Sequence, residues 1–462
     1  MKVKIGLETH VQLSTKSKLF CSCQNPVWSE AEPNSFLCPT CLGMPGSKPR
    51  ANRKAIEFAV KIALALNCHV LQESHFSRKT YFYPDMPKNY QITQYELPLA
   101  ENGWLELEGK TIRIKRIHLE EDPAKLQHVG GLKGKYTLVD YNRAGIPLVE
   151  IVTHPDFTTP EEARRFISKL EAILEYLGVY NPKSFAVIKS DANISLEGGE
   201  RIEVKNITGA KEIEQALKFE LVRQQNLLKR GLKPERETRA WNPDLQVTEP
   251  LREKELEEEY GYIFDPDLPA IKLEKGFIEK IRKSLPELPE AKLSRFIKQY
   301  GLNQKLAESL VSDRGLAELF EWLSKRIDPK LAASWAAGPL KKTLNWHKLT
   351  WEELGVRPEW ILEVLKLYQQ GKLTDLNAEL TIRKLVEEKR PPREIIRDYE
   401  WEKEKIDLKP LLSQLIKEYP GAVQDYKKGK TQALDFLVGK AVAETRGKVD
   451  PKEIREILKK LL

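Results

Sequence analysis

The sequence predicts an α+β fold in which a mixed domain built on an antiparallel sheet is followed by two all-helical domains. Apolar and polar residues alternate in short segments such as Trp104–Glu108, Thr111–Ile114 and Ile202–Lys205, which is typical of half-buried antiparallel strands. Turn residues at Glu101–Gly103 and Glu197–Gly199 favour hairpins between such segments. After about residue 270 the apolar period becomes helical almost throughout.

The domain boundaries follow from shifts in composition. Helical periods also interrupt the first part, at 51–67, 160–178 and 213–228. The segment Phe264–Pro269 is rich in Asp and Pro and indicates a boundary, and the composition shifts again near Trp401. A chain of 462 residues has room for two to four domains. We therefore expect domains at residues 1–272, 273–400 and 401–462.

The composition is that of a well-charged globular protein, with 41% hydrophobic and 31% charged residues and a net charge of +8. No run of eighteen apolar residues occurs, so we expect no transmembrane helix and no membrane partner. The first residues lack the apolar stretch of a signal peptide, and we expect a cytoplasmic protein. In that compartment cysteines are more often metal ligands than disulfides.

Four of the five cysteines fall within 21 residues, as Cys21-x-Cys23 and Cys38-Pro-x-Cys41. Two short thiolate pairs at this separation are typical of a tetrahedral zinc site. Because four thiolates leave no open position, the zinc is expected to be structural. The alternative is two unrelated buried pairs. Cys68 falls in a helical pattern and is expected to be a small core residue.

Three acidic positions and one histidine indicate a site for a divalent cation. Glu8 and His10 alternate with Thr9 on one predicted strand and so share a face, although a strand histidine more often satisfies a local hydrogen bond. Glu150 interrupts the apolar strand Pro147–Val152, where an unpaired carboxylate is costly. We expect a metal ion or a cation to face it, with Lys79, Lys125 and Arg143 as candidate cations.

The third acidic position is a run of carboxylates, Glu120-Glu121-Asp122, directly after His118-Leu. Three adjacent carboxylates repel one another and gain nothing in a merely structural loop. Mg²⁺ offsets that repulsion, and it prefers a few hard oxygen ligands together with phosphate. The run therefore favours a magnesium and phosphate site.

The segment from Arg78 to Lys88, RKTYFYPDMPK, places basic groups among aromatic rings. Arg78, Lys79 and Lys88 can neutralise phosphates and the rings can stack on a base. The alternative is a surface loop whose aromatic side chains pack on the core. No phosphate-binding GxxxxGK[ST] loop and no dinucleotide GxGxxG motif opens a helix, so a nucleotide site would be of another kind.

The last 55 residues are locally basic, with twelve Lys and Arg against seven Asp and Glu. Two glycine turns carry much of this charge and are candidates for gripping an RNA backbone. A solvated basic helical domain is the alternative. The candidate RNA-binding residues are Lys427, Lys428, Lys430, Arg446 and Lys448.

Read together, these stretches resemble the B subunit of the aspartyl/glutamyl-tRNA amidotransferases. The resemblance runs in family order from residue 5 to about residue 451. Its motifs are IGLETHVQLSTKSKLFC, CPTCLGMPGSKPRANRKAIEFA, RKTYFYPDMPKNYQITQYELPL, HLEEDPAK, LVDYNRAGIPLVEIVTHPD, SDANISL, EVKN and ALDFLVGKAVAETRGKVDP.

The resemblance implies a cradle-shaped mixed α/β domain, a helical domain and a helical tail that contacts tRNA. It implies two partners: an amidase subunit, called A in the family, that releases ammonia from glutamine, and a small third subunit, called C. It also implies that the chain binds Asp-tRNA(Asn) or Glu-tRNA(Gln) and uses ATP and Mg²⁺ to phosphorylate the tRNA-linked carboxylate. Ammonia then displaces phosphate to give Asn-tRNA or Gln-tRNA.

The resemblance also implies roles for single residues. The catalytic residues are expected to be Glu8, His10, Lys79, Glu120, Glu121 and Glu150. Of these, Glu8, His10, Glu121 and Glu150 match the Mg²⁺ region, with Glu120 as a neighbour. Arg78, Lys79, Tyr81 and Lys88 match the stretch that lines the ATP pocket. Cys21, Cys23, Cys38 and Cys41 match a zinc knuckle present in many members.

The sequence departs from the family pattern at three places. Thr9 stands where an apolar residue is usual, and Pro123-Ala124 replaces Ala-Gly. In the element from Glu259 to Asp267, Gly261 stands where Arg is typical, which puts a role for that Arg in doubt. Neither the change at Thr9 nor that at Pro123-Ala124 removes an expected ligand.

Two other functions are compatible with parts of the sequence. One is the archaeal subunit that serves only Glu-tRNA(Gln), which normally carries an inserted domain that 462 residues do not accommodate. The other is a non-catalytic RNA-binding protein with a zinc knuckle and a basic tail. That hypothesis leaves the acidic positions unexplained.

Overall fold

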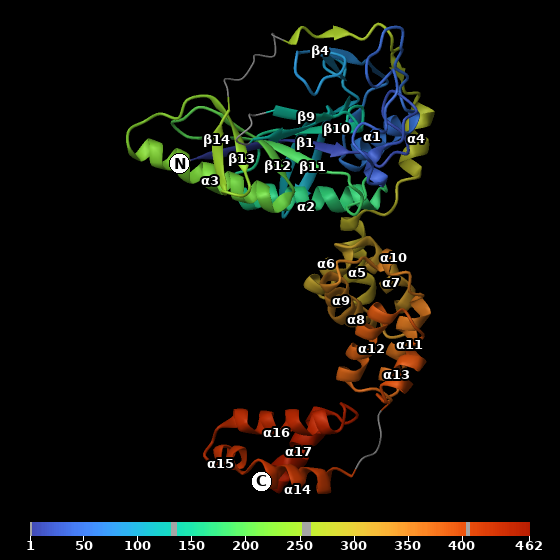
Figure 1. Cartoon of the computed structure of the whole chain (residues 1–462), viewed down its shortest axis with the longest axis vertical. Helices are drawn as coiled ribbons and strands as arrows, with labels where there is room; N and C mark the ends of the chain where they lie inside the picture. Colours follow the sequence, from blue (N-terminus) through green and yellow to red (C-terminus); the bar gives the residue numbers. More distant parts are fainter. Residues whose placement is uncertain (1, 131–135, 252–259, 403–406) are drawn as a thin grey trace. The chain divides into compact units, whose positions relative to one another are not determined.

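The computed structural model describes residues 2–130, 136–251, 260–402 and 407–462, and its chain divides into two compact units, Met1–Leu288 and Pro289–Leu462 (Figure 1). The described strands all belong to the first unit, and the described elements of the second are helical. The α+β class is therefore confirmed. The three domains bounded near 272 and 400 stay a prediction, and residues 403–406 of the second expected boundary lie outside the described residues.

The strands of the first unit are β1 (Val3–Gln12), β2 (His69–Val70), β3 (Glu73–Ser74), β4 (Ser77–Thr80), β5 (Tyr90–Thr93), β6 (Ala100–Leu107), β7 (Lys110–Glu121), β8 (Lys125–Val129), β9 (Tyr136–Asp140), β10 (Pro147–Thr153), β11 (Ile188–Leu196), β12 (Ile202–Thr208), β13 (Glu237–Asn242), β14 (Val247–Pro250), β15 (Ile263–Phe264) and β16 (Ile271–Lys272).

The helices of the first unit are η1 (Pro26–Trp28), α1 (Arg53–Ala65), α2 (Pro160–Tyr176), α3 (Ala210–Lys229) and α4 (Lys275–Lys283). Those of the second are α5 (Pro289–Tyr300), α6 (Gln304–Val311), α7 (Arg314–Ser324), α8 (Pro329–Trp335), η3 (Ala336–Leu340), α9 (Lys341–Trp346), α10 (Trp351–Leu354), α11 (Pro358–Gln369), α12 (Asp375–Glu388), α13 (Pro392–Asp398), α14 (Leu408–Glu418), α15 (Pro420–Lys427), α16 (Thr431–Glu444) and α17 (Pro451–Leu461). Among the described residues no helix is long and apolar enough to cross a membrane.

A nine-stranded sheet forms the body of the first unit, in the order β14-β13-β12-β11-β1-β10-β7-β6-β2. Neighbouring strands are antiparallel except β12 and β13, which are parallel. Strand β1 lies at the centre, between β11 and β10. Polar side chains on β1, β10 and β7 are therefore neighbours although they are far apart in the sequence.

The two faces of β1 differ in polarity because successive side chains alternate. Ile5, Leu7 and Val11 are fully buried in the core, and Thr9 lies with them. The Thr9 hydroxyl is 3.1 Å from the Ser190 hydroxyl on β11, so this departure from the family pattern costs no unpaired polar group. Helices α2 and α3 run along one face of the sheet in Figure 1.

One predicted turn is wrong. Glu197–Gly199 does connect β11 and β12, but Glu101–Gly103 lies inside β6, and the turn to β7 is made at Glu108 and Gly109, both with positive φ. Gly103 serves close packing, since an added Cβ there would overlap with the Cys68 sulfur. Turn residues inside a strand often mark such an approach of another backbone.

The last four helices have a hydrophobic core of their own. Its members are Leu408, Leu412, Leu415, Leu434, Leu437, Val438, Ala441, Val449, Ile454 and Leu458, all buried. Helix α17 begins with a capping Asp450, whose carboxylate accepts a hydrogen bond from the Lys452 amide at 2.8 Å, and with Pro451 at its first position.

Candidate active site

The strand register of the central sheet brings a histidine of β1 beside two glutamates. His10 lies opposite Glu150 on β10, and Glu150 lies opposite His118 on β7. His10 Nε2 is 3.4 Å from Glu150 Oε2, and His10 Nδ1 is 4.0 Å from Glu120 Oε1. His118 Nε2 completes the cluster at 3.3 Å from Glu150 and 3.6 Å from Glu120.

The four side chains are strongly coupled electrostatically. Burial lowers the pKa of His10, but Glu150 and Glu120 outweigh it and raise the pKa to about 10. For His118 the same balance raises the pKa to about 9. Burial raises the pKa of Glu150, and the two imidazoles more than offset this and hold it well below its usual range. The carboxylates are therefore ionised at neutral pH.

Three members of the cluster fit a divalent cation. His10, Glu120 and Glu150 each offer one ligand atom, and these atoms lie within 4.8 Å of one another. Carboxylate oxygens are the protein ligands that Mg²⁺ prefers. The cations expected opposite Glu150 were Lys79, Lys125 and Arg143, but the imidazoles of His10 and His118 lie there instead.

Glu121 does not join this cluster. It is adjacent to Glu120 on β7, so its side chain points to the other face. There its carboxylate pairs with Lys88 Nζ and accepts a hydrogen bond from the Ile92 amide at 2.9 Å. The structure thus brings Glu120, expected as a neighbour of the Mg²⁺ region, into the cluster with His10 and Glu150, whereas Glu121 lies outside that cluster. It also gives Lys88, expected at the ATP phosphates, a buried carboxylate partner.

Glu8 lies on the same face of β1 as His10 and opposite Asp191 on β11. Asn193 Nδ2 donates to Glu8 Oε1 at 3.2 Å, and Lys205 Nζ is 3.3 Å from Asp191 Oδ2. A second group of carboxylates therefore extends the polar face beyond His10. No role was predicted for Asp191 in the SDANISL motif, although alternation on a predicted strand could have placed it on this face.

Arg78 anchors a distant segment of the chain. Its Nε donates to Asp265 Oδ2 at 2.9 Å, its terminal nitrogen donates to Asp267 Oδ2 at 3.1 Å, and its guanidinium lies 4.4 Å from the centre of the Tyr90 ring. Asp265 is buried, so this ion pair is held away from solvent. Arg78 was expected at the ATP phosphates, and in the structure two carboxylates already engage it.

Lys79 points into a group of aromatic rings. Its Nζ lies 4.4 Å from the centre of the Tyr260 ring and 6.0 Å from that of Tyr81. Burial raises the pKa of Tyr81, and nearby carboxylates add to the effect. Gly261, where the family typically has Arg, has a φ of +51° and open space around it. Glu259, the first residue of that expected element, lies outside the described residues.

The four predicted zinc ligands converge. Cys21, Cys23, Cys38 and Cys41 each place a sulfur within 4.8 Å of the others. The Cys38 amide donates to Cys41 Sγ at 3.2 Å, an arrangement typical of a metal knuckle. A hydrogen bond with Cys21 is the largest influence on the Cys41 thiol and lowers its pKa to about 5. Four thiols at these distances fit tetrahedral zinc.

The turn that follows the Cys38–Cys41 pair packs against Lys88. Gly43 follows the Cys38–Cys41 pair with a φ of +65°, and an added Cβ would overlap with Lys88 Cγ. Lys88 in turn holds Glu121, next to Glu120. The four-cysteine group is therefore linked through Lys88 to Glu121, which is adjacent in sequence to Glu120 of the cluster.

The predicted RNA-binding residues lie at two turns. Lys427 and Lys428 are exposed at the end of α15, and Lys430 pairs with Asp425 at 3.1 Å. Arg446 pairs with Glu400 at 2.6 Å, and Lys448 follows in the turn after α16. Arg446 thus has a protein partner, which sequence reasoning did not foresee because Glu400 is distant in the chain.

Known proteins are similar to this chain along its whole length. The family description "GatB/GatE catalytic domain" matches residues 3–279, and "GatB domain" matches residues 318–462. A relative from Methanospirillum hungatei, named as the B subunit of aspartyl/glutamyl-tRNA(Asn/Gln) amidotransferase, is 46% identical over 99% of this chain and 98% of its own length. Relatives of the same name from Sulfurisphaera tokodaii and Thermotoga maritima are 43% and 42% identical, over 100% and 99% of this chain and 98% of their own lengths.

The acidic cluster, the four cysteines and the motifs around them thus occur in a chain that matches these relatives from end to end. The expected resemblance is confirmed, because both matched regions and the full-length relatives agree. The chain belongs to the family formed by the B subunits of the aspartyl/glutamyl-tRNA amidotransferases.

Proposed function

We propose that this chain is the kinase and tRNA-binding subunit of a glutamine-dependent tRNA amidotransferase. It binds Asp-tRNA(Asn) or Glu-tRNA(Gln) and transfers the γ-phosphoryl group of ATP to the side-chain carboxylate of the attached amino acid. Ammonia then displaces phosphate and gives the amide. The cluster of His10, Glu120 and Glu150 on the polar face of the sheet carries this proposal. The names of its relatives support it.

The chemistry explains why such a cluster is needed. A carboxylate is a poor acyl donor, and phosphorylation gives it a leaving group. The protein's contribution to phosphoryl transfer is positioning and neutralisation of charge. When bound, Mg²⁺ would supply charge neutralisation at the phosphates, with His10, Glu120 and Glu150 as its ligands.

The surrounding residues orient that ligand set. His118 contacts both Glu120 and Glu150, and the Thr93 hydroxyl donates to Glu120 at 3.1 Å. Such contacts fix the direction of ligand oxygens. Glu8 extends the polar face toward Asp191, and Lys79, which lies beside the Tyr81 ring, is proposed to meet the nucleotide together with Tyr81.

The zinc is proposed to be structural, held by Cys21, Cys23, Cys38 and Cys41. The chain is proposed to act in the cytoplasm with the family's amidase subunit, called A, and its small third subunit, called C. Ammonia has to reach the phosphorylated carboxylate without loss to water, which requires a partner that generates it within the complex.

The test is an ATPase assay on the reconstituted complex with glutamine and Glu-tRNA(Gln) or Asp-tRNA(Asn). We expect ADP release that depends on the aminoacylated tRNA and on Mg²⁺, with Gln-tRNA or Asn-tRNA as product. Absence of tRNA-dependent ADP release would favour a non-catalytic RNA-binding role. Activity on Glu-tRNA(Gln) alone would favour the narrower archaeal activity.

A further inference from the structure

A basic pocket lies in the second unit, between the end of α11, helix α13 and the turn after α16. Its volume is about 600 Å³, within the range of pockets that hold small ligands. The lining contains four cations and two carboxylates. It consists of Leu367, Lys372, Leu373, Arg393, Ile396, Arg397, Glu400, Glu402 and Lys448.

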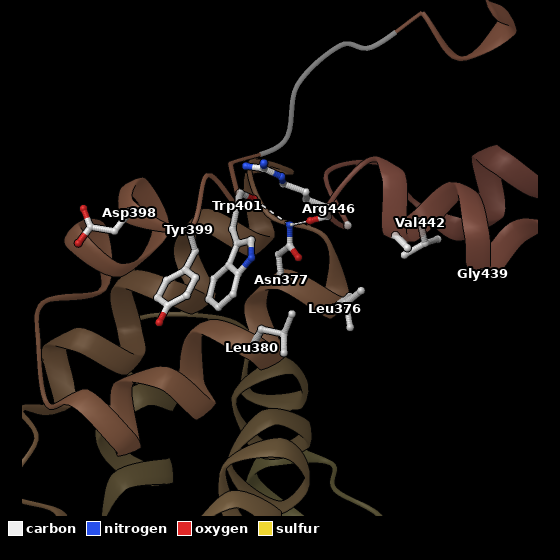
Figure 2. Close-up of a pocket in the computed structure, with 11 residues that line it drawn as sticks. Leu376, Asn377, Leu380, Asp398, Tyr399, Trp401, Gly439, Val442 and Arg446 are labelled. Atoms are coloured by element: carbon white, nitrogen blue, oxygen red, sulfur yellow. Dashed lines mark hydrogen bonds between the residues drawn. The ribbon is translucent and has the colours of Figure 1, made fainter. Parts of the chain in front are cut away.

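Lys448 reaches this pocket because the turn that precedes it is docked on α12. Figure 2 shows Asn377 at the centre of this contact: its Nδ2 donates to the carbonyls of Trp401 at 3.0 Å and Arg446 at 3.3 Å. Thr374 Oγ1 donates to the Gly447 carbonyl at 2.7 Å. Thr374, Asn377 and Gly447 are all buried, so the contact is shielded from solvent.

Positive charge dominates the open part of the pocket. The side chains of Arg393 and Arg397 are 79% and 78% exposed, and their guanidinium groups contact the carboxylates of Glu363 and Asp398, respectively. Because a guanidinium has five N–H donors, each Arg keeps donors for a further acceptor. Of the two lining carboxylates, Glu400 is paired with Arg446, which is not part of the lining.

We propose that this pocket binds a backbone phosphate of the tRNA. The inference rests on the proposed function and adds a subsite that joins the helical region to the tail. Arg and Lys side chains that converge from separate elements are suited to a phosphate, which accepts several charge-assisted hydrogen bonds at once. The docked turn fixes Lys448 relative to Arg393 and Arg397, so the pocket is formed before the RNA arrives.

The experiment measures tRNA affinity of the whole complex at several salt concentrations. The test variant is Lys372→Ala with Arg397→Ala, and the control is Lys305→Ala, an exposed lysine at the start of α6. Each lost phosphate contact lowers the slope of log K against log salt by about 0.7 to 0.9. We expect the test variant to weaken binding by about tenfold, to reduce the slope by about one, and to leave kcat at saturating tRNA unchanged.

Unchanged affinity and slope in the test variant would overturn the pocket proposal, and so would an equal loss in the control. A fall in kcat with unchanged affinity would also overturn it. A wild-type complex that fails to bind aminoacylated tRNA would overturn the proposed function itself, and the pocket with it. Because the exchanged side chains are exposed, thermal unfolding of both variants is expected to match the wild type.

Discussion

At the scale of single residues, the adjacent glutamates of β7 have different tasks. Glu120 faces His10, His118 and Glu150 across the sheet, whereas Glu121 pairs with Lys88 on the opposite face. Glu120 is positioned to bind a cation, whereas Glu121 holds the loop that carries Lys88. Substituting each glutamate in turn therefore separates an effect on catalysis from an effect on folding stability.

We expect Glu120→Gln to lower kcat for tRNA-dependent ADP formation by about a hundredfold or more, since the amide removes a charge that the cation needs. Glu121→Gln leaves Lys88 without its buried partner and should cost about 3 kcal/mol of folding stability. Chemical unfolding and steady-state kinetics of both variants test this. A Glu120→Gln variant with the kcat of the wild type would contradict the proposal that Glu120 binds the cation.

The raised pKa values of His10 and His118 predict a pH dependence of metal binding. Without a metal, the two imidazolium groups stabilise the fold below their unfolded pKa of about 6.5. This stabilisation is lost as the pH rises through about 9 and 10. Because protons and Mg²⁺ compete for the same negative charge, apparent Mg²⁺ affinity should rise from pH 7 to pH 9.

The check is thermal unfolding with EDTA and with Mg²⁺ at each pH. The increase in Tm that Mg²⁺ causes should grow with pH, and calorimetry in two buffers should detect proton release on binding. A constant Tm increase together with no proton release would rule this coupling out.

At the scale of elements, alternation along the strands explains what could be predicted and what could not. The alternation of β6, β7 and β12 could be predicted from the sequence, and so could the shared face of Glu8 and His10 on β1. The convergence of four cysteines also followed from spacing. Contacts such as Arg78 with Asp265 and Lys88 with Glu121 depend on how distant segments pack, which local patterns do not contain. The turn misplaced at Glu101–Gly103 had the same cause, since Cys68 packs there.

The docked turn after α16 provides a test at this scale. Gly447 has a φ of +70°, and an added Cβ would lie 2.5 Å from Asn377 Oδ1. Gly429 has a φ of +92° with nothing within 4 Å of the same position. Both Gly→Ala variants carry backbone strain of about 1 kcal/mol, but only Gly447→Ala also collides with α12.

Hydrogen exchange should therefore rise at the start of α12 and in residues 445–449 of Gly447→Ala, and stay near wild type there in Gly429→Ala. Through Lys448, Gly447→Ala should also weaken tRNA binding several-fold. Equal exchange in the two variants would show that strain alone, and not the contact with Asn377, governs the turn.

At the scale of the whole molecule, the proposed catalytic cluster and the proposed RNA-binding turns belong to separate units of the chain. The cluster of His10, Glu120 and Glu150 belongs to the first unit, and the basic turns belong to the second. The last four helices have a core of their own, so their removal leaves the sheet and its polar face intact. This separation predicts which kinetic constants a truncation changes.

A chain ending at Glu402, assembled into the complex, should keep kcat for ADP formation within about twofold of the full chain at saturating tRNA. Its KM for tRNA should rise by about tenfold or more, because Lys427, Lys428, Lys430 and Lys448 are lost and with them several phosphate contacts. Steady-state kinetics over a range of tRNA concentrations separate the two constants. A fall in kcat at unchanged KM would show that the tail acts on the phosphoryl-transfer site. If neither KM nor kcat changed, the proposal that the tail binds RNA would be refuted.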